Sequence, residues 1–220
     1  MKDMGLLSQL VYYFSHNGMY VLSQFNQTFL VSIYGVLLGA IVGIPLGIWI
    51  SQYRRLSPVI IGIANVIQTI PSLAMLSILM LGLGLGQTTV IVTVFLYSLL
   101  PIIKNTYTGM LSVDSDVLDA GKGMGMTRFQ IMMTIRVPLS LSVIIAGIRN
   151  ALVIGIGITV IGSFIGSGGL GDIIVRGTNA TDGGAIILAG ALPTALMAII
   201  TDLVLSFIEK RLTPKTSSEK

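Results

Sequence analysis

The sequence predicts an all-α integral membrane protein with five transmembrane helices, an N-terminal interfacial helix and short cytoplasmic helices. Three observations support this prediction. First, 53% of the 220 residues are hydrophobic and only 10% are charged, whereas soluble chains carry about 25% charged residues. Second, the apolar residues gather in long stretches without charge. Third, nearly all basic residues outside those stretches fall on one side of the expected membrane.

Composition also excludes several kinds of site. The chain has no Cys, and its one histidine is His16. Disulfides, thiol chemistry and Cys/His metal clusters therefore lack the residues that build them, and we predict no metal site. The net charge of +4 is explained by membrane orientation, so we expect no nucleic-acid partner.

Residues 1–26 predict an extracellular segment with a short interfacial helix. Leu6, Leu10 and Phe14 can share one helix face, and the nearby tyrosines suit a lipid headgroup region. Lys2 is balanced by Asp3 and polar residues interrupt the apolar run, which argues against a signal peptide.

A transmembrane domain is expected over residues 27–210. The predicted spans cover residues 28–50, 58–83, 88–103, 138–165 and 185–208, and a polar cytoplasmic tail follows at 211–220. At roughly 1.5 Å per residue, about 20 helical residues cross a hydrocarbon core of about 30 Å. In the first span a glycine recurs at every fourth position, which predicts close packing against another helix. These glycines are Gly35, Gly39, Gly43 and Gly47.

Basic residues determine the expected orientation. Five spans place ten Lys and Arg on one side of the membrane and two on the other, with Arg149 inside a span. Because cytoplasmic loops carry the excess of Lys and Arg, the N-terminus is expected outside. The loop 104–137 and the C-terminus are then cytoplasmic. The ten are Arg54, Arg55, Lys104, Lys122, Arg128, Arg136, Lys210, Arg211, Lys215 and Lys220, and the two are Lys2 and Arg176.

Polar side chains cluster in the second span. Four of them recur at helical spacing and predict one polar face, and Pro71 predicts a kink because it removes a backbone donor. Unsatisfied polar groups are costly in lipid, so this face either bonds to neighbouring helices or lines a translocation path or gate. The candidate residues are Asn65, Gln68, Thr69, Pro71 and Ser72.

Arg149 and Asp202 form a candidate intramembrane charge pair. Both fall in the inner half of the bilayer, judged by their distance from the cytoplasmic ends of their spans. We expect them to pair, and the alternative is that each faces water or a second subunit. An unpaired charge at that depth costs at least about 2.5 kcal/mol.

The loop from Asp114 to Pro138 mixes charged and apolar residues, which predicts short amphipathic helices. An ordinary solvated loop would show the same mixture. The spacing within this loop is more specific. It runs Asp119-Ala120-Gly121, three residues, Gly125, nine residues and then Ile135-Arg136-Val137-Pro138. This arrangement resembles the signature loop of ABC-transporter permeases. That pattern is Glu-Ala-Ala, three residues, Gly, nine residues and Ile-x-Leu-Pro. Asp119, Gly121 and Val137 depart from it conservatively.

The resemblance implies that coupling helices in this loop seat in a groove of a cytoplasmic ABC ATPase. Small residues would let another backbone approach closely, and the methionines would supply adaptable apolar contacts. The predicted ATPase-coupling residues are Asp119, Ala120, Gly121, Met124, Gly125, Met126, Thr127, Ile135 and Pro138.

Other stretches resemble permeases of the glycine betaine/carnitine/choline osmolyte group. They are Gln68 to Ser72 (QTIPS), Ala146 to Arg149 (AGIR) and Phe164 to Gly171 (FIGSGGLG). The five-span plan is shared with amino-acid importers of the methionine type, which remain the alternative. The resemblance implies a non-enzymatic permease subunit in the bacterial plasma membrane. Its expected partners are two ATPase chains that bind ATP and Mg²⁺, a second permease chain that is identical or paralogous, and an extracellular substrate-binding protein.

Two glycine-rich stretches superficially match nucleotide motifs. Residues 166–171 satisfy G-x-G-x-x-G, but they lie between two membrane helices and not between a strand and a helix. Residues 82–89 (GLGLGQTT) resemble a phosphate loop, but Gln87 occupies the Lys position. We therefore expect no nucleotide or other cofactor on this chain, and a tight turn at residues 166–171.

Two other classes of membrane protein remain as rivals. A secondary transporter usually shows an inverted repeat and buried ion-coupling acids, and Asp202 is the only acid within the predicted spans. A purely scaffolding subunit would tolerate changes at Gln68 or Ser72. Phe95, Tyr97 and Phe164 are the main aromatic candidates for contact with a quaternary ammonium. Because they are few, we expect recognition to reside mostly in the binding protein.

Overall fold

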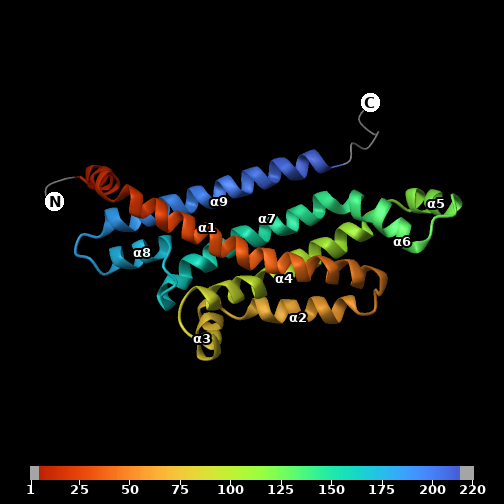
Figure 1. The fold of residues 1–220 in the computed structure, drawn as a ribbon, viewed down its shortest axis with the longest axis horizontal. Helices are drawn as coiled ribbons and strands as arrows, with labels where there is room; N and C mark the ends of the chain where they lie inside the picture. Colours follow the sequence, from red (N-terminus) through yellow and green to blue (C-terminus); the bar gives the residue numbers. More distant parts are fainter. Residues whose placement is uncertain (1–4, 214–220) are drawn as a thin grey trace.

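The computed structural model describes residues 5–213, which contain helices and turns but no strand. The helices are α1 (Leu6–Gln52), α2 (Ser57–Thr69), α3 (Ser72–Leu83), α4 (Gln87–Leu111), α5 (Ser115–Gly123), α6 (Arg128–Gln130), η1 (Ile131–Arg136), α7 (Val137–Ile161), η2 (Gly162–Ile165), α8 (Leu170–Thr178) and α9 (Gly184–Leu212). Figure 1 shows that α1, α4, α7 and α9 run along the long axis. Helix α8 lies at the end where α1 begins, and α5 and α6 lie at the opposite end.

Four helical segments of the described chain are long and apolar enough to cross a bilayer. They are α1, α4, α9 and a continuous run from Arg128 to Ile165 that includes η1, α7 and η2. The bent pair α2 and α3 supplies a fifth only if it is counted as one broken span. Predicted and observed helix ends differ most in the first span, because α1 begins at Leu6 and not at residue 28. In the third span, α4 continues eight residues past the predicted end at 103.

The predicted interfacial helix is not a separate element. Helix α1 runs without a break for 47 residues, roughly 70 Å at 1.5 Å per residue, which exceeds the hydrocarbon thickness of a bilayer. Its first turns are angled away from the rest of the helix (Figure 1). Residues 15–18 (SHNG) are turn-type residues, but the helix continues through them and joins residues 6–26 to the span that follows. Residues 1–4 and 214–220, which carry Lys2, Lys215 and Lys220, lie outside the described residues.

The glycine repeat in α1 packs against α4, as predicted. A Cβ added at Gly35 would lie 2.6 Å from Val94 Cβ, and one at Gly47 would lie 2.6 Å from Thr106 Cβ. Gly39 and Gly43 face Ser98 and Ile102 of α4 in the same way, and all four glycines are buried. Any side chain at these positions would force α1 and α4 apart.

The kink predicted at Pro71 is a complete break in the helix. Helices α2 and α3 meet at an angle of 95°, and Ile70 between them is extended. Pro71 lacks an N–H and disfavours helical backbone at the residue before it. The hydroxyl of Tyr97, a buried residue of α4, donates a hydrogen bond to the Ile70 carbonyl. The break is therefore capped by a neighbouring helix, which removes the cost of an unpaired carbonyl in the membrane.

The remaining helices surround α7. It packs between α4 and α9, and α8 packs against α9. The π-helical stretch η1 leads into α7 and ends two residues before Pro138. Pro138 cannot donate to the carbonyl of Thr134 inside that stretch, which accounts for the disturbed hydrogen-bond ladder.

Candidate functional site

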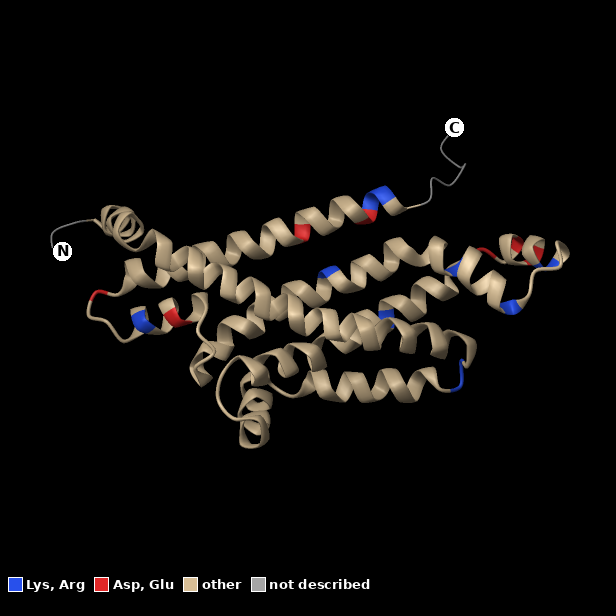
Figure 2. Ribbon diagram, viewed as in Figure 1, with Lys and Arg blue, Asp and Glu red and all other residues tan. Residues whose placement is uncertain are grey.

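Three regions of the described chain are candidates for function: the segment 114–138, a polar cavity among α2, α4, α7 and α9, and the contact between α1 and the Gly-rich turn at 166–171. Figure 2 shows that charges gather at the two ends of the molecule, with a few on the central helices. Each region is described below.

The segment 114–138 folds into two short helices that pack on each other. Asp114 caps α5 by accepting a hydrogen bond from the Asp116 N–H at 2.9 Å. Gly121 is buried, and a Cβ there would lie 2.8 Å from Ile135 Cδ1. Gly121 and Ile135 therefore hold α5 against η1, and Met126 Sδ, 3.4 Å from the same Cβ position, completes the contact.

The turn between α5 and α6 explains two more predicted residues. Gly125 has φ +77°, a left-handed conformation that favours glycine. Thr127 begins α6 with a capping box, in which its Oγ1 accepts from the Gln130 N–H at 3.3 Å and its N–H donates to Gln130 Oε1 at 2.8 Å. Both residues therefore fix the shape of the turn.

The other predicted coupling residues face solvent. Asp119 pairs with Lys122 at 2.7 Å on the surface, and Ala120 and Pro138 are exposed. Met124 is 74% exposed and Phe129 is 70% exposed. Phe129 was not among the predicted coupling residues, but the structure places it with Met124, Val117 and Met133 among the exposed apolar side chains of this segment.

Of the polar residues predicted in the second span, Gln68 alone lines the polar cavity. Asn65 and Thr69 are exposed, and the Thr69 hydroxyl donates to the Val66 carbonyl at 2.7 Å. Ser72 lies on α3 beyond the break at Pro71. The prediction of one continuous polar face was therefore wrong, because the 95° bend redirects the chain between Thr69 and Ser72.

The cavity has a volume of about 610 Å³. Its polar walls come from α2, α4, α7 and α9, and the rest of its lining is mainly aliphatic. Sequence analysis had counted Lys104 only as a loop charge and had not singled out the two asparagines. The polar residues are Gln68, Lys104, Asn105, Thr108, Asn150 and Asp202.

Arg149 and Asp202 meet at the edge of this cavity. Arg149 Nη1 lies 3.3 Å from Asp202 Oδ1, so the two side chains make direct contact across α7 and α9. Glu209, seven residues and about two turns further along α9, is a third member that sequence analysis missed: its Oε2 lies 3.4 Å from Arg149 Nε. That contact is an ion pair without hydrogen-bond geometry, because neither atom makes a hydrogen bond. What this triad does in transport stays a prediction.

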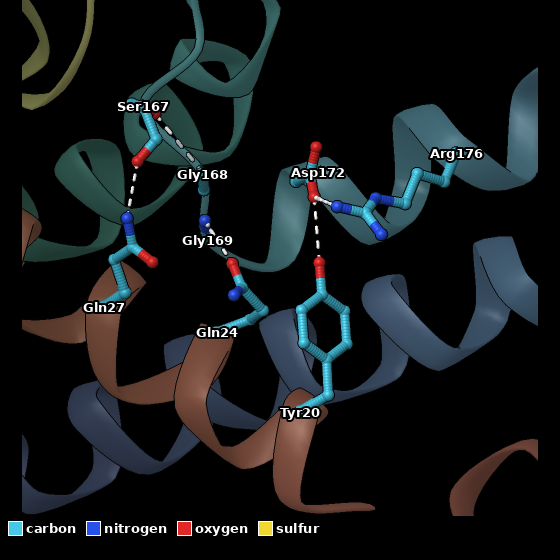
Figure 3. Close-up of polar contacts among 8 residues, drawn as sticks. All are labelled: Tyr20, Gln24, Gln27, Ser167, Gly168, Gly169, Asp172 and Arg176. Atoms are coloured by element: carbon cyan, nitrogen blue, oxygen red, sulfur yellow. Dashed lines mark hydrogen bonds and ion pairs between the residues drawn. The ribbon is translucent and has the colours of Figure 1, made fainter. Parts of the chain in front are cut away.

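Four side chains of α1 hold the Gly-rich turn and the start of α8, and Figure 3 draws three of them, Tyr20, Gln24 and Gln27. The Gly169 N–H donates to Gln24 Oε1 at 2.7 Å, and Gln27 Nε2 donates to the Ser167 carbonyl at 2.6 Å. The Tyr20 hydroxyl donates to Asp172 Oδ2 at 2.9 Å. The fourth, Thr28 Oγ1, accepts from the Leu170 N–H at 2.8 Å. We call these contacts the outer clasp.

Arg176 completes the outer clasp. Its Nη2 lies 2.8 Å from Asp172 Oδ2, and its guanidinium lies 5.3 Å from the centre of the Tyr20 ring. Gly168 and Gly169 have φ +71° and +84°, so the turn needs glycine at both positions. The turn predicted at residues 166–171 is present, and it leads into α8, a helix that the sequence did not predict.

Comparison with known proteins gives the family. The profile of the family described as binding-protein-dependent transport system inner membrane component matches residues 35–214. A chain from a structure of the MetNI methionine ABC transporter superposes with a TM-score of 0.74 at 20% identity, covering 89% of this chain and 98% of that one. This likeness shows the fold alone.

Sequence relatives are much closer. The glycine betaine/carnitine/choline transport system permease protein OpuCD of Bacillus subtilis (strain 168) is 63% identical over 211 residues, 96% of this chain and 92% of the relative. Another permease protein of the same named system in that organism, OpuCB, is 40% identical over 95% of this chain and 96% of its own length. The resemblance to ABC-transporter permeases is thus confirmed. This chain is a multi-pass bacterial membrane protein that belongs to the family of binding-protein-dependent transport system inner membrane components.

Proposed function

We propose that this chain is the permease subunit of an ATP-driven importer for a quaternary ammonium osmolyte: glycine betaine, carnitine or choline. The identity of 63% to OpuCD of Bacillus subtilis supports this substrate class. An amino-acid importer of the methionine type is the second candidate, supported by the fold match to MetNI. Uptake by the reconstituted complex of the three quaternary ammonium compounds, with methionine as the comparison, separates the two.

We infer that the bent pair α2–α3 is one broken span, which gives five spans and places the termini on opposite sides. The start of α1 and the end of α9 lie at opposite ends of the long axis (Figure 1), which supports this inference. Arg54, Arg55 and Arg136 lie together around one cavity at the end near α5. The excess of basic residues then assigns that end to the cytoplasm.

The proposed ATPase contact is the surface formed by Met124 and Phe129. Apolar side chains this exposed outside the membrane are typical of a protein interface, and methionine adapts to a partner surface. Each of two ATPase chains would seat one such segment and bind the ATP and Mg²⁺. The observation that carries the proposal is that Gly121 and Ile135 fix α5 against η1, so that movement of the ATPase is passed to α7 and not absorbed by a loose loop.

The proposed second permease chain is a paralogue. In Bacillus subtilis two permease proteins, OpuCD and OpuCB, carry the name of one transport system. This chain is 63% identical to the first and 40% to the second, so its partner should be an OpuCB-like chain. A separate binding protein would deliver substrate at the extracellular end, where α8 lies.

Alternating access then follows from the coupling between the state of the ATPases and the conformation of the permease. A ligand or partner shifts a conformational equilibrium only through its different affinity for the two states. Closure of the ATPases around ATP would favour the state open to the outside, and their separation would favour the state open to the cytoplasm. The break between α2 and α3 supplies an element able to move without unfolding a continuous helix.

Met124→Glu tests the coupling surface. A charge at an exposed anchor should weaken seating of the ATPase and lower ATP hydrolysis stimulated by loaded binding protein by at least about tenfold. Leu212→Glu is the matched control, since it places the same charge at the cytoplasmic end of α9 and should leave stimulation within about twofold. Normal stimulation of ATP hydrolysis and normal uptake in the Met124 variant would contradict the assignment of this segment as the coupling element.

Gly125 needs a more careful substitution than a bulky charge. Gly125→Arg would add side-chain bulk and would also strain the left-handed backbone. Asparagine tolerates that conformation better than other residues. Retained coupling in Gly125→Asn together with lost coupling in Gly125→Arg would show that bulk at the interface, and not strain in the turn, blocks the ATPase.

A further inference from the structure

We propose that the polar cavity among α2, α4, α7 and α9 is a transient binding site for a zwitterion, with Lys104 facing its carboxylate and Asp202 facing its quaternary ammonium. This inference rests on the proposed function, because it names the residues that would recognise that substrate class inside the membrane.

The first observation is that most polar side chains of the cavity have no partner in the protein. Within residues 5–213, Gln68, Lys104 and Asn150 make no hydrogen bond or ion pair. Asn105 donates one hydrogen bond to the Pro101 carbonyl at 2.7 Å and leaves its side-chain oxygen free. Groups of this kind are costly in a bilayer unless water or a ligand satisfies them. Their convergence on one cavity from three helices indicates a wet site.

The second observation is the separation of charge between two walls. Lys104 on α4 is exposed and unpaired, so it offers a cationic donor to a carboxylate. Asn150 on α7 is exposed and offers neutral amide donors. The opposite charge comes from Asp202 on α9.

The ion triad leaves negative charge on the Asp202 wall. Arg149 lies between two carboxylates, those of Asp202 and Glu209. One positive charge against two negative charges leaves a formal net charge of −1 on the triad. The Asp202 side chain is 46% exposed, and this residue lines the cavity. A trimethylammonium group cannot donate a hydrogen bond, and it is attracted by such a charge.

The third observation concerns the strength of the site. The volume of about 610 Å³ falls within the range of about 300–1,000 Å³ typical of small-molecule pockets. None of the residues that line it is aromatic, so the cation–π cage that gives tight binding of quaternary ammonium groups is missing. Tyr97, one of the aromatic candidates, instead caps the break at Ile70. A weak site suits a path, because a substrate must leave it as easily as it enters.

Two readouts test the proposal on the complete transporter in liposomes. The first is the maximal uptake rate of glycine betaine, carnitine and choline at saturating, loaded binding protein. The second is saturation-transfer NMR on the trimethyl protons of each compound with the purified permease–ATPase complex, without binding protein or ATP. The variant is Lys104→Gln, which removes the charge from an exposed residue without internal contacts and should fold normally.

We expect Lys104→Gln to lower the uptake and the NMR signal of the two carboxylate-bearing substrates by at least about fivefold, the loss of one charge-assisted hydrogen bond. Choline has no carboxylate, so both readouts for choline should stay within about twofold. Lys210→Gln is the matched control: it removes the same charge on the same side of the membrane but outside the cavity. Asp202→Asn should lower all three substrates.

Equal loss for all three compounds, or no loss for any, in Lys104→Gln would overturn the zwitterion site and leave the proposed function standing. Uptake of none of them by the wild-type transporter would overturn the proposed function together with the site. Selective loss for betaine and carnitine, with choline spared, supports both.

Discussion

The outer clasp and the polar cavity carry similar polar side chains on different helices, with opposite results. In the outer clasp, Gln24 and Gln27 each bond to the backbone of the Gly-rich turn. In the polar cavity, the side chains of Gln68 and Asn150 have no hydrogen-bond or ion-pair partner within the described chain. The comparison shows that a glutamine near the membrane stabilises the fold where it satisfies a backbone group. Where it lines a cavity without a partner in the protein, it is available for function.

The strongest test of this comparison is Gly169→Ala in the outer clasp. A Cβ at this position would lie 2.6 Å from Thr28 Oγ1, on a residue with φ +84°. Left-handed strain and overpacking together should cost about 4 kcal/mol, seen as a large drop in the thermal unfolding midpoint of the purified permease. Gly84→Ala is the control, since its φ of +80° and ψ of −175° nearly equal those of Gly169, with open space around it, so that it carries only the strain. Equal destabilisation of the two variants would contradict a tightly packed clasp.

The ion triad lies at the edge of the cavity and should show an intermediate effect. Arg149→Ala leaves the two carboxylates of Asp202 and Glu209 facing each other. Breaking a buried pair costs about 3–5 kcal/mol, which partial exposure reduces to about 2 kcal/mol. Asp202→Ala should cost less, because Glu209 still balances Arg149. Assembly yield and unfolding midpoint measure both, and a more harmful Asp202→Ala would show that Glu209 is not part of the triad.

Gln24→Leu and Gln68→Leu compare the two regions directly. Gln24→Leu leaves the Gly169 N–H unpaired, which should cost about 1–2 kcal/mol of stability. Gln68→Leu removes a side chain that has no partner, so its stability should be unchanged, while uptake falls if Gln68 contacts the passing solute. Gln24→Leu should therefore lower the unfolding midpoint, whereas Gln68→Leu should lower the uptake rate and leave the unfolding midpoint unchanged. Unchanged uptake in Gln68→Leu would favour a scaffolding role for this wall.

The sequence predicted features that depend on neighbours along the chain. The four-residue glycine repeat predicted a packing face, and α4 lies against it. Pro71 predicted a disturbed helix, although the bend is far sharper than a kink because Tyr97 stabilises the open backbone at Ile70. The loop pattern around Gly125 predicted the family and the short helices of the segment 114–138.

Features that depend on partners distant in the sequence were missed. Nothing in the spacing of Gln24 and Gln68 reveals that one meets the turn at 166–171 and the other a cavity. Glu209 was not singled out by the sequence, because its contact with Arg149 is set by the packing of α9 on α7. Helix α8 has nine residues between glycine-rich and polar segments, too short to give a helical pattern.

The seam between α1 and α4 restricts how the transporter can work. Four glycines bring α4 side chains and carbonyls almost against the backbone of α1, so α1 has no side chains at these contacts that could readjust if the helices slid or tilted. These two helices should therefore travel as one rigid body through every stage of transport. The moving joints must then lie elsewhere: at the break between α2 and α3, and where α9 meets α7. A disulfide engineered across the seam should be harmless to uptake, whereas one that locks either joint should arrest it.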